Sequence, residues 1–343
     1  MAAGAGAEAN ERDSKYGSTR TEAEVTIPPP ATGAGSGGQN RSLKGFGLFL
    51  LVLCAAFWRP LFDLARYAAR SELYSHILIL PVISLYLAAL KRKALPRDVA
   101  GNATAACIPA FVGLLVLLSY AVLRSQGWKP GDNDYLSITV FSWFFFLTGG
   151  FLFFFGSNTL RALAFPLGFL VFMAPFPSTF TNWLEAFLQH GSADAASALF
   201  SLTGATVFRS GQVFQLPGIV LEVAKECSGI HSSLVLFLTS LLAGHLCLRS
   251  PWKRAALALA VLPLGIARNG VRIFTIAMLC VHVDPGMIQS PIHTRGGPVF
   301  FALSLLPFFV LLFLLRRSER PGKKTKPAGG ELPVRTVGGS VQK

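Results

Sequence analysis

The residue best suited to chemistry is Cys227, which lies in the polar stretch Glu222-Val-Ala-Lys-Glu-Cys-Ser-Gly-Ile-His-Ser-Ser233. We expect an apolar helix to begin at Ser228 or Gly229. The dipole at the N-terminus of that helix favours a thiolate, which is the nucleophilic form of cysteine. The other cysteines lie in apolar runs and are interpreted as inert small residues: Cys54, Cys107, Cys247 and Cys280.

A second polar group occurs inside an apolar run, in Arg268-Asn-Gly-Val-Arg-Ile273. Arg268, Asn269 and Arg272 share one helix face, because residues three and four apart are neighbours on a helix. An arginine within a membrane indicates function or a buried partner. Arg272 is too far from the inner surface to reach it, and pairing with Glu222 or Glu226 is an open alternative.

Two histidines compete for the role of catalytic base. His293 lies in Gln289-Ser-Pro-Ile-His-Thr-Arg-Gly-Gly297, directly before the last apolar run. His231 follows Cys227 by four residues and therefore shares its helix face. His282 and His76 are weaker candidates. The residues alone do not choose between His293 and His231.

The elements that position these residues are membrane helices. Hydrophobic residues make up 52% of the 343-residue chain and charged residues 14%, with a mean hydropathy of +0.51. A soluble protein carries about 25% charged residues. The net charge of +14 comes from basic clusters between apolar runs. This pattern follows the positive-inside rule and argues against nucleic-acid binding.

We predict an all-α membrane protein with about eight transmembrane helices. With the N-terminus inside, 21 Lys and Arg fall on the cytoplasmic side and eight outside, which orients the chain. The predicted spans are 45–58, 73–90, 103–123, 135–156, 160–174, 229–248, 255–281 and 298–315, with the ends of the first and fifth least defined.

This topology brings Cys227, Arg272 and His293 to the outer mouth of consecutive helices. A cysteine, a histidine and a cationic donor to an oxyanion are what acyl transfer through a thioester requires. The sequence contains no HExxH or paired CxxC motif and no phosphate-binding glycine loop, so we expect no metal and no cofactor.

The segment 175–228 differs from the spans. Pro175-Phe-Pro177 stops a helix, and 178–203 mixes apolar and polar residues, which predicts an amphipathic helix at the outer interface. Short β-prone runs between Gly204 and Val223 predict a small hairpin before the cysteine motif.

The two ends of the chain are predicted to be cytoplasmic disordered tails. Residues 1–44 are rich in Ala, Gly, Ser, Thr and Pro, and residues 316–343 are basic; neither composition can bury a core. The first apolar run begins too late for a signal peptide. The catalytic domain is then 45–315.

These motifs together resemble the exosortase/archaeosortase family. The resemblance rests on Glu226-Cys-Ser-Gly-Ile230, Asn269-Gly-Val-Arg-Ile273 and His293 with Gly297 and Phe300. It extends to Ser75-His76, to Pro175-Phe-Pro177 and to the segment from Gly204 to Val223, and covers roughly residues 45–315.

The resemblance implies a multi-pass cysteine protease or transpeptidase of the prokaryotic cytoplasmic (inner) membrane, with its active site on the extracytoplasmic face. Its substrates would be exported proteins that end in a short motif (Pro-Glu-Pro in many bacterial substrates), a transmembrane helix and a basic cluster. The implied catalytic set is Cys227, Arg272 and His293, which favours His293 over His231. Asn269, Glu226, Ser228 and Gly229 are supporting residues.

In the implied mechanism a thioester on Cys227 is resolved by water or by an unknown acceptor nucleophile. Two other classes of protein are weighed against this enzyme. A transporter would show inverted repeats and helices broken near mid-membrane, and no repeat is evident. A non-catalytic scaffold for polysaccharide export would tolerate replacement of Cys227.

Overall fold

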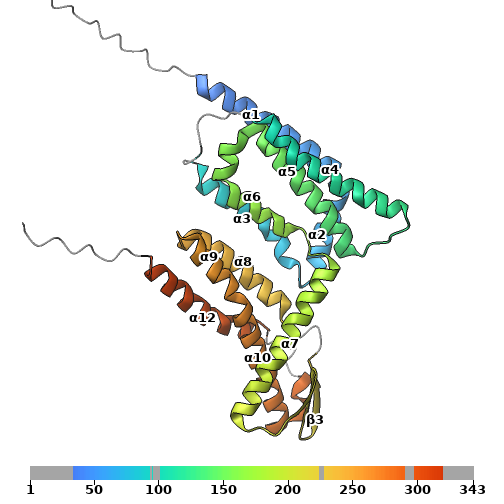
Figure 1. Cartoon of the computed structure of the whole chain (residues 1–343), viewed down its shortest axis with the longest axis vertical. Helices are drawn as coiled ribbons and strands as arrows, with labels where there is room; N and C mark the ends of the chain where they lie inside the picture. The colour runs from blue at the N-terminus through green and yellow to red at the C-terminus, as the bar shows by residue number, and fades with distance from the viewer. Residues whose placement is uncertain (1–33, 93–94, 96–100, 224–227, 290–296, 320–343) are drawn as a thin grey trace, which may run out of the picture.

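The computed structural model describes residues 34–92, 95, 101–223, 228–289 and 297–319. Helices dominate, with one small sheet (Figure 1). The elements are α1 (Ala34–Ala56), α2 (Trp58–Arg70), η1 (Ser75–Ile79), α3 (Leu80–Leu90), α4 (Ala103–Ser125), α5 (Asp132–Ala162), α6 (Ala164–Phe169), η3 (Leu170–Met173), α7 (Ser178–Thr203), β1 (Phe208–Ser210), β2 (Val213–Leu216), β3 (Ile219–Glu222), α8 (Ile230–Cys247), α9 (Pro251–Leu259), α10 (Val261–His282), η5 (Pro285–Gln289) and α12 (Gly297–Arg317).

The helices α4 and α5 pack side by side along most of their length because small residues line the contact. The Ser142 hydroxyl donates to the Gly113 carbonyl at 2.7 Å. A Cβ on Gly149 would lie 3.2 Å from the Ala106 carbonyl oxygen. Small residues at helix contacts let backbones approach closely, as is common between membrane helices.

The predicted count of eight spans is not confirmed. Among the described residues, five helices are long and apolar enough to cross a membrane, and up to seven spans result if each of two bent pairs is one span. The bent pairs are 40–56 with α2, at 72°, and 164–173 with α7, at 90°. The apolar helix Ser75–Leu90 falls short of the roughly 20 residues that a bilayer core requires.

Two regions of the structure are more helical than expected. The first is α2, which occupies a stretch expected to be an outer loop. Its charged residues lower its mean hydropathy, but Leu64 and Ala68 lie four apart and both are buried. The second is α1, which begins at Ala34, so residues 34–44 of the expected N-terminal tail belong to a helix. Residues 1–33 and 320–343 of the expected tails lie outside the described residues.

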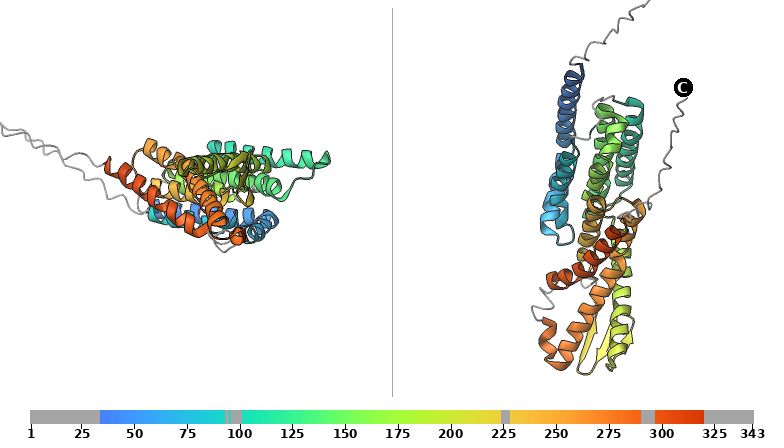
Figure 2. Two further views of the ribbon diagram at one scale, coloured as in Figure 1. Left: turned by 90° about the horizontal axis from the view of Figure 1, so that it is seen from below. Right: turned by 90° about the vertical axis from the view of Figure 1, so that its left-hand side faces the viewer.

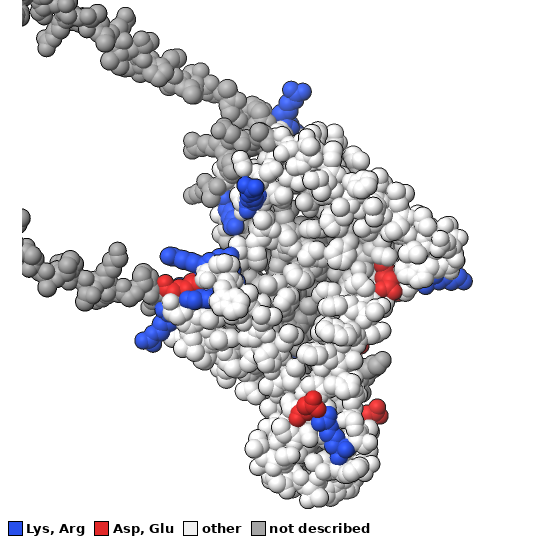
Figure 3. Space-filling view, in the orientation of Figure 1, with Lys and Arg blue, Asp and Glu red and all other residues white. Residues whose placement is uncertain are grey.

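Two contacts between distant segments agree with the predicted topology, because each joins segments that are expected on the same side of the membrane. At one end, the Lys91 ammonium donates to the Ala162 carbonyl at 3.1 Å. At the other end, the Asp134 carboxylate accepts from the backbone N–H and the hydroxyl of Ser178, at 2.8 and 2.6 Å. A broad surface between the charged side chains is uncharged (Figure 3), as a lipid-facing band would be. Which end faces the cytoplasm stays a prediction.

The helices α7 and α10 form a pair that extends away from the other helices and carries the sheet at its far end (Figures 1 and 2). A glycine of each helix faces the other helix. A Cβ on Gly191 would lie 2.9 Å from Ile266, and a Cβ on Gly270 would lie 2.6 Å from the Ala195 side chain. The two helices are therefore in direct backbone-level contact.

The predicted hairpin is present and has one more strand, in the antiparallel order β1-β2-β3. Strand β2 pairs Val213 with Glu222 of β3, and Arg209 of β1 lies opposite Phe214. Phe214 is fully buried in a core shared with α7 and α10, where its ring lies 5.5 Å from that of Phe200. The sheet is thus fixed to the α7–α10 pair.

The predicted helix 178–203 coincides with α7, and its exposed face changes character halfway along. Its first half carries Phe180, Trp183 and Phe187, all exposed. Its second half presents His190 and Asp194 on the exposed side. Aromatic side chains followed by polar ones are typical of a helix that leaves the membrane at its interface.

Candidate active site

The structure describes five of the eight residues expected at the site. Ser228, Gly229 and His231 lie at the start of α8, and Asn269 and Arg272 lie on α10. Glu226, Cys227 and His293 lie outside the described residues. The site is therefore built from the turn that follows Cys227 and from the α10 residues that contact it.

Gly229 ends that turn and is the N-cap of α8, with φ +72° and ψ 16°. L-residues with a side chain rarely adopt this left-handed conformation. Space excludes a side chain as well, because a Cβ would lie 2.9 Å from Nη2 of Arg268 and 3.3 Å from the side-chain amide of Asn269. A glycine is therefore required here for both backbone conformation and packing.

Arg268 connects α10 to the turn. It is 8% exposed, and its Nη2 donates to the Gly229 carbonyl at 3.2 Å and to the Ser233 hydroxyl at 3.4 Å. Its Nη1 is buried and has no hydrogen-bond partner in the described part of the chain. The turn at Gly229 and the helix residue Arg268 are about forty residues apart in the sequence. They meet through this hydrogen bond between a side chain and the backbone.

Asn269 and Arg272 complete the α10 contribution. Asn269 is 2% exposed and lies beside Gly229. Arg272 is half-buried one helical turn beyond Arg268, and the two guanidinium groups are close enough to repel each other electrostatically. Arg268 therefore places a cation at the start of α8, where the helix dipole is positive too.

His231 faces the same region from α8. It is half-buried, and no described residue makes a hydrogen bond to its Nδ1. His76, in η1, is within electrostatic range of His231. The Ser75-His76 motif thus lies near the cysteine motif, although the sequence separates the two by about 150 residues.

The segment that leads into Cys227 is held by α7. The Gln189 side chain donates to the Val223 carbonyl, and both residues are buried. Val223 is the last described residue before 224–227. The strand β3 and the start of α8 are therefore each fixed to a helix on either side of the cysteine.

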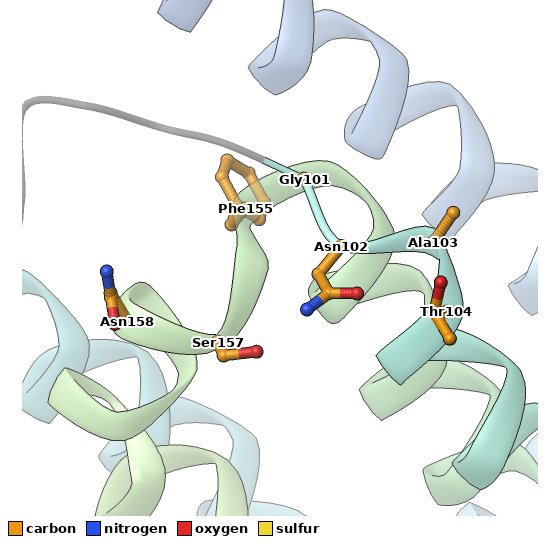
Figure 4. Close-up of a pocket in the computed structure, with 7 residues that line it drawn as sticks. All are labelled: Gly101, Asn102, Ala103, Thr104, Phe155, Ser157 and Asn158. Carbon is orange, nitrogen blue, oxygen red and sulfur yellow. The ribbon is translucent and has the colours of Figure 1, made fainter.

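Other polar groups in the described chain do not form a competing site. No group of three or more His, Cys, Asp or Glu that could hold a metal ion occurs among the described residues. A hollow of about 490 Å³ opens between the start of α4 and the break in α5 at Gly156, and none of the expected site residues lines it (Figure 4).

Sequence reasoning gave Arg268 a place on the functional helix face but no role. Its burial and its contact with Gly229 depend on how α8 and α10 pack, which the sequence does not reveal. The one signal present in the sequence was the cost of a second arginine within an apolar helix.

The fold and the site define a class: a helical membrane protein in which Arg268 and Asn269 contact the turn that follows a cysteine. The family model of the transmembrane exosortases (Exosortase_EpsH) matches residues 58–310. The chain belongs to this family. No curated protein and no solved structure matches the chain.

Proposed function

We propose that this exosortase is a membrane cysteine peptidase or transpeptidase that removes the C-terminal sorting signal of exported proteins. The observation that supports this most is the contact of the Ser228–Gly229 turn with Arg268 and Asn269. The turn that directly follows Cys227 in the sequence is thus in contact with α10, the helix that also carries Arg272. The predicted orientation puts this site at the extracytoplasmic face of the cytoplasmic membrane.

The proposed reaction uses three side chains. The Cys227 thiolate attacks the scissile carbonyl carbon, forming a C–S bond and a tetrahedral oxyanion that the Arg272 guanidinium stabilises. As the C–N bond breaks, its electron pair leaves with nitrogen, and protonated His293 gives the departing amine a proton. Neutral His293 then takes a proton from water or from an acceptor amine. That nucleophile attacks the thioester and releases the Cys227 thiolate.

The proposed substrates are proteins with a short motif, a transmembrane helix and a basic cluster at the C-terminus. The positive-inside rule keeps the basic cluster on the cytoplasmic side. The motif is then held at the outer membrane surface, level with the predicted position of Cys227. No cofactor takes part in the proposed mechanism.

The test is a processing assay in membranes. A reporter that ends in Pro-Glu-Pro, a transmembrane helix and a basic cluster is co-expressed with the enzyme, and its size is followed. We expect no processing by Cys227→Ala or His293→Ala. For Arg272→Ala we expect a loss of about 10²–10³-fold, as for removal of an oxyanion donor.

His231→Ala is the matched comparison, because it removes the rival base. Activity in this variant supports His293 as the acid–base residue. An inactive His231→Ala with an active His293→Ala would reassign the base and leave the enzyme class in place. Processing by Cys227→Ala would overturn the thioester mechanism and favour the non-catalytic scaffold.

A further inference from the structure

Three polar atoms around the start of α8 have no hydrogen-bond partner among the residues that the structure describes. They are Oγ of Ser228, Nδ1 of His231 and Nη1 of Arg268. Ser228 is 2% exposed and Arg268 is 8% exposed, so water does not readily satisfy either. All three residues border Gly229, either along the chain or through the Arg268–Gly229 hydrogen bond.

An unpartnered guanidinium nitrogen in this place is unfavourable for three reasons. A buried donor without an acceptor costs about 1–3 kcal/mol, and more when it is charged. A cation at a helix N-terminus opposes the helix dipole. Arg272 adds the repulsion of a second cation. An oxygen ligand with negative charge would offset all three.

The geometry of Arg268 leaves it able to bind such an oxygen while it holds the turn. A guanidinium presents five N–H groups in a rigid planar fork. Nη2 is used by Gly229 and Ser233, so Nη1 is free to donate in a second direction. A lysine ammonium is a compact point charge on a flexible chain and does not reproduce this two-sided arrangement.

We propose that Arg268 is a second oxygen-binding guanidinium of the active site: Nη2 positions the turn that follows Cys227, and Nη1 binds an oxygen of the acyl group that reacts with Cys227. This inference deepens the proposed function and rests on it for the identity of the acyl group. The ligand class is a peptide carbonyl oxygen that becomes negatively charged during the reaction.

The test uses two small alkylating probes that need no substrate. Iodoacetate and iodoacetamide react with the same Cys227 thiolate, but only iodoacetate carries a carboxylate. The ratio of their rates therefore cancels the thiolate fraction and reports an anion-binding group beside the sulfur. Rates are measured on the full chain in detergent micelles, from the Cys227 peptide by mass spectrometry, so other cysteines do not interfere.

For Arg268→Gln we expect the iodoacetate-to-iodoacetamide ratio to fall about tenfold, as for loss of one charge-assisted hydrogen bond. Arg268→Lys keeps the charge and should give an intermediate ratio. It also carries the test if the Gln variant is not recovered in folded form. An unchanged ratio in both variants would overturn the proposal.

Arg254→Gln is the matched control. Arg254 likewise holds the carbonyl of a cap residue of α8: its Nε and Nη2 donate to the C-cap residue Leu248 at 2.9 and 2.7 Å, at the opposite end of the helix. Its ratio should equal that of the wild type. An equal fall in Arg254→Gln would indicate a general structural effect and would reject the proposal.

Arg272→Gln separates the two arginines. A fall in this variant with no change in Arg268→Gln would assign oxygen binding to Arg272 and overturn the inference. The result is independent of the processing assay. If Cys227→Ala still processes the reporter while Arg268→Gln lowers the ratio, the proposed function fails and the oxygen site stands.

Discussion

Each end of α8 is held by an arginine, but the two ends differ in whether their polar groups have hydrogen-bond partners. At the C-terminal end, Arg254 donates twice to the Leu248 carbonyl, and Glu319 accepts the N–H groups of Arg249 and Ser250 at 2.9 Å each. At the N-terminal end, Nη1 of Arg268 is buried and has no hydrogen-bond partner among the described residues.

The helix dipole makes this difference informative. A cation at a helix C-terminus is favourable, and the Arg254 guanidinium lies at the carbonyl end of α8, although its backbone belongs to the first turn of α9. A cation at the N-terminus is unfavourable, so stability alone does not account for Arg268. Fully hydrogen-bonded polar groups, as at the C-terminal end, are typical of structural contacts. A buried donor without an acceptor, as at the N-terminal end, is typical of a ligand-binding site.

Of the changes that test this comparison, the largest effect should come from adding a methyl group at the N-terminal end, as Gly229→Ala. The left-handed conformation costs an L-residue about 1–2 kcal/mol, and the new Cβ would push against Arg268 and Asn269. We expect the processing rate to fall at least about tenfold, because the new Cβ displaces Arg268 and Asn269, and a loss of about 1.4 kcal/mol in transition-state stabilisation is a factor of ten.

Gly218→Ala is the control for that change. Gly218 also has a positive φ, of 82°, but a Cβ there meets no atom within 4 Å. It should lose stability to a similar degree from backbone strain and keep its processing rate. Equal losses of processing in both variants would mean that the contact with Arg268 is irrelevant.

A smaller effect is expected for Gln189→Leu, which leaves the buried Val223 carbonyl without its side-chain donor. Such a loss typically costs about 1–3 kcal/mol. Thermal unfolding in detergent should occur at a lower temperature, and processing should slow because the segment before Cys227 loses an anchor. Gln215→Leu, at an exposed position of β2, should match the wild type. A wild-type melting temperature in Gln189→Leu would contradict this prediction.

The smallest effect is expected at the C-terminal end of α8, for Glu319→Gln. The N–H groups of Arg249 and Ser250 hold the pKa of the Glu319 carboxyl below its ordinary value of 4.5. The carboxylate therefore stabilises the fold above about pH 4.5, and this contribution disappears as the pH falls through the lowered pKa.

The melting temperature of wild type should exceed that of Glu319→Gln slightly at pH 7, and the difference should vanish on acidification. Processing at neutral pH should be unchanged, because this end of α8 lies away from the candidate site. A difference that grows as the pH falls would contradict the assigned sign.

The sequence predicted the elements that local rules determine. Pro175-Phe-Pro177 and Gly204 bound the predicted helix 178–203, and α7 ends at Gly204 in the left-handed conformation. The same local rules predicted a hairpin from Gly and Pro spacing, although the pairing of the short strand β1 was not readable. Hydropathy does not predict α2, because its charged residues lower the average. The only sign of the helix in the sequence is the four-residue spacing of Leu64 and Ala68.

The site could be predicted only as a set of motifs expected at one face. That the start of α8 and the Asn–Arg motif meet is consistent with the predicted alternation of spans. The particular contact, of Arg268 rather than Arg272 with Gly229, depends on helix rotation and axial register. The rotation and the axial register of a helix cannot be read from the residue pattern of a single sequence.

The glycine contacts between α7 and α10 have a mechanical consequence. Gly191 faces Ile266 and Gly270 faces Ala195, so each helix has a side chain set into a gap of the other. A slide of one residue along the helix axis is about 1.5 Å and would move both side chains out of register. The two helices are therefore fixed in one axial register. Because α10 carries Arg268 and Asn269 and packs its far half against the sheet, this fixed register also fixes where the two side chains lie relative to the sheet.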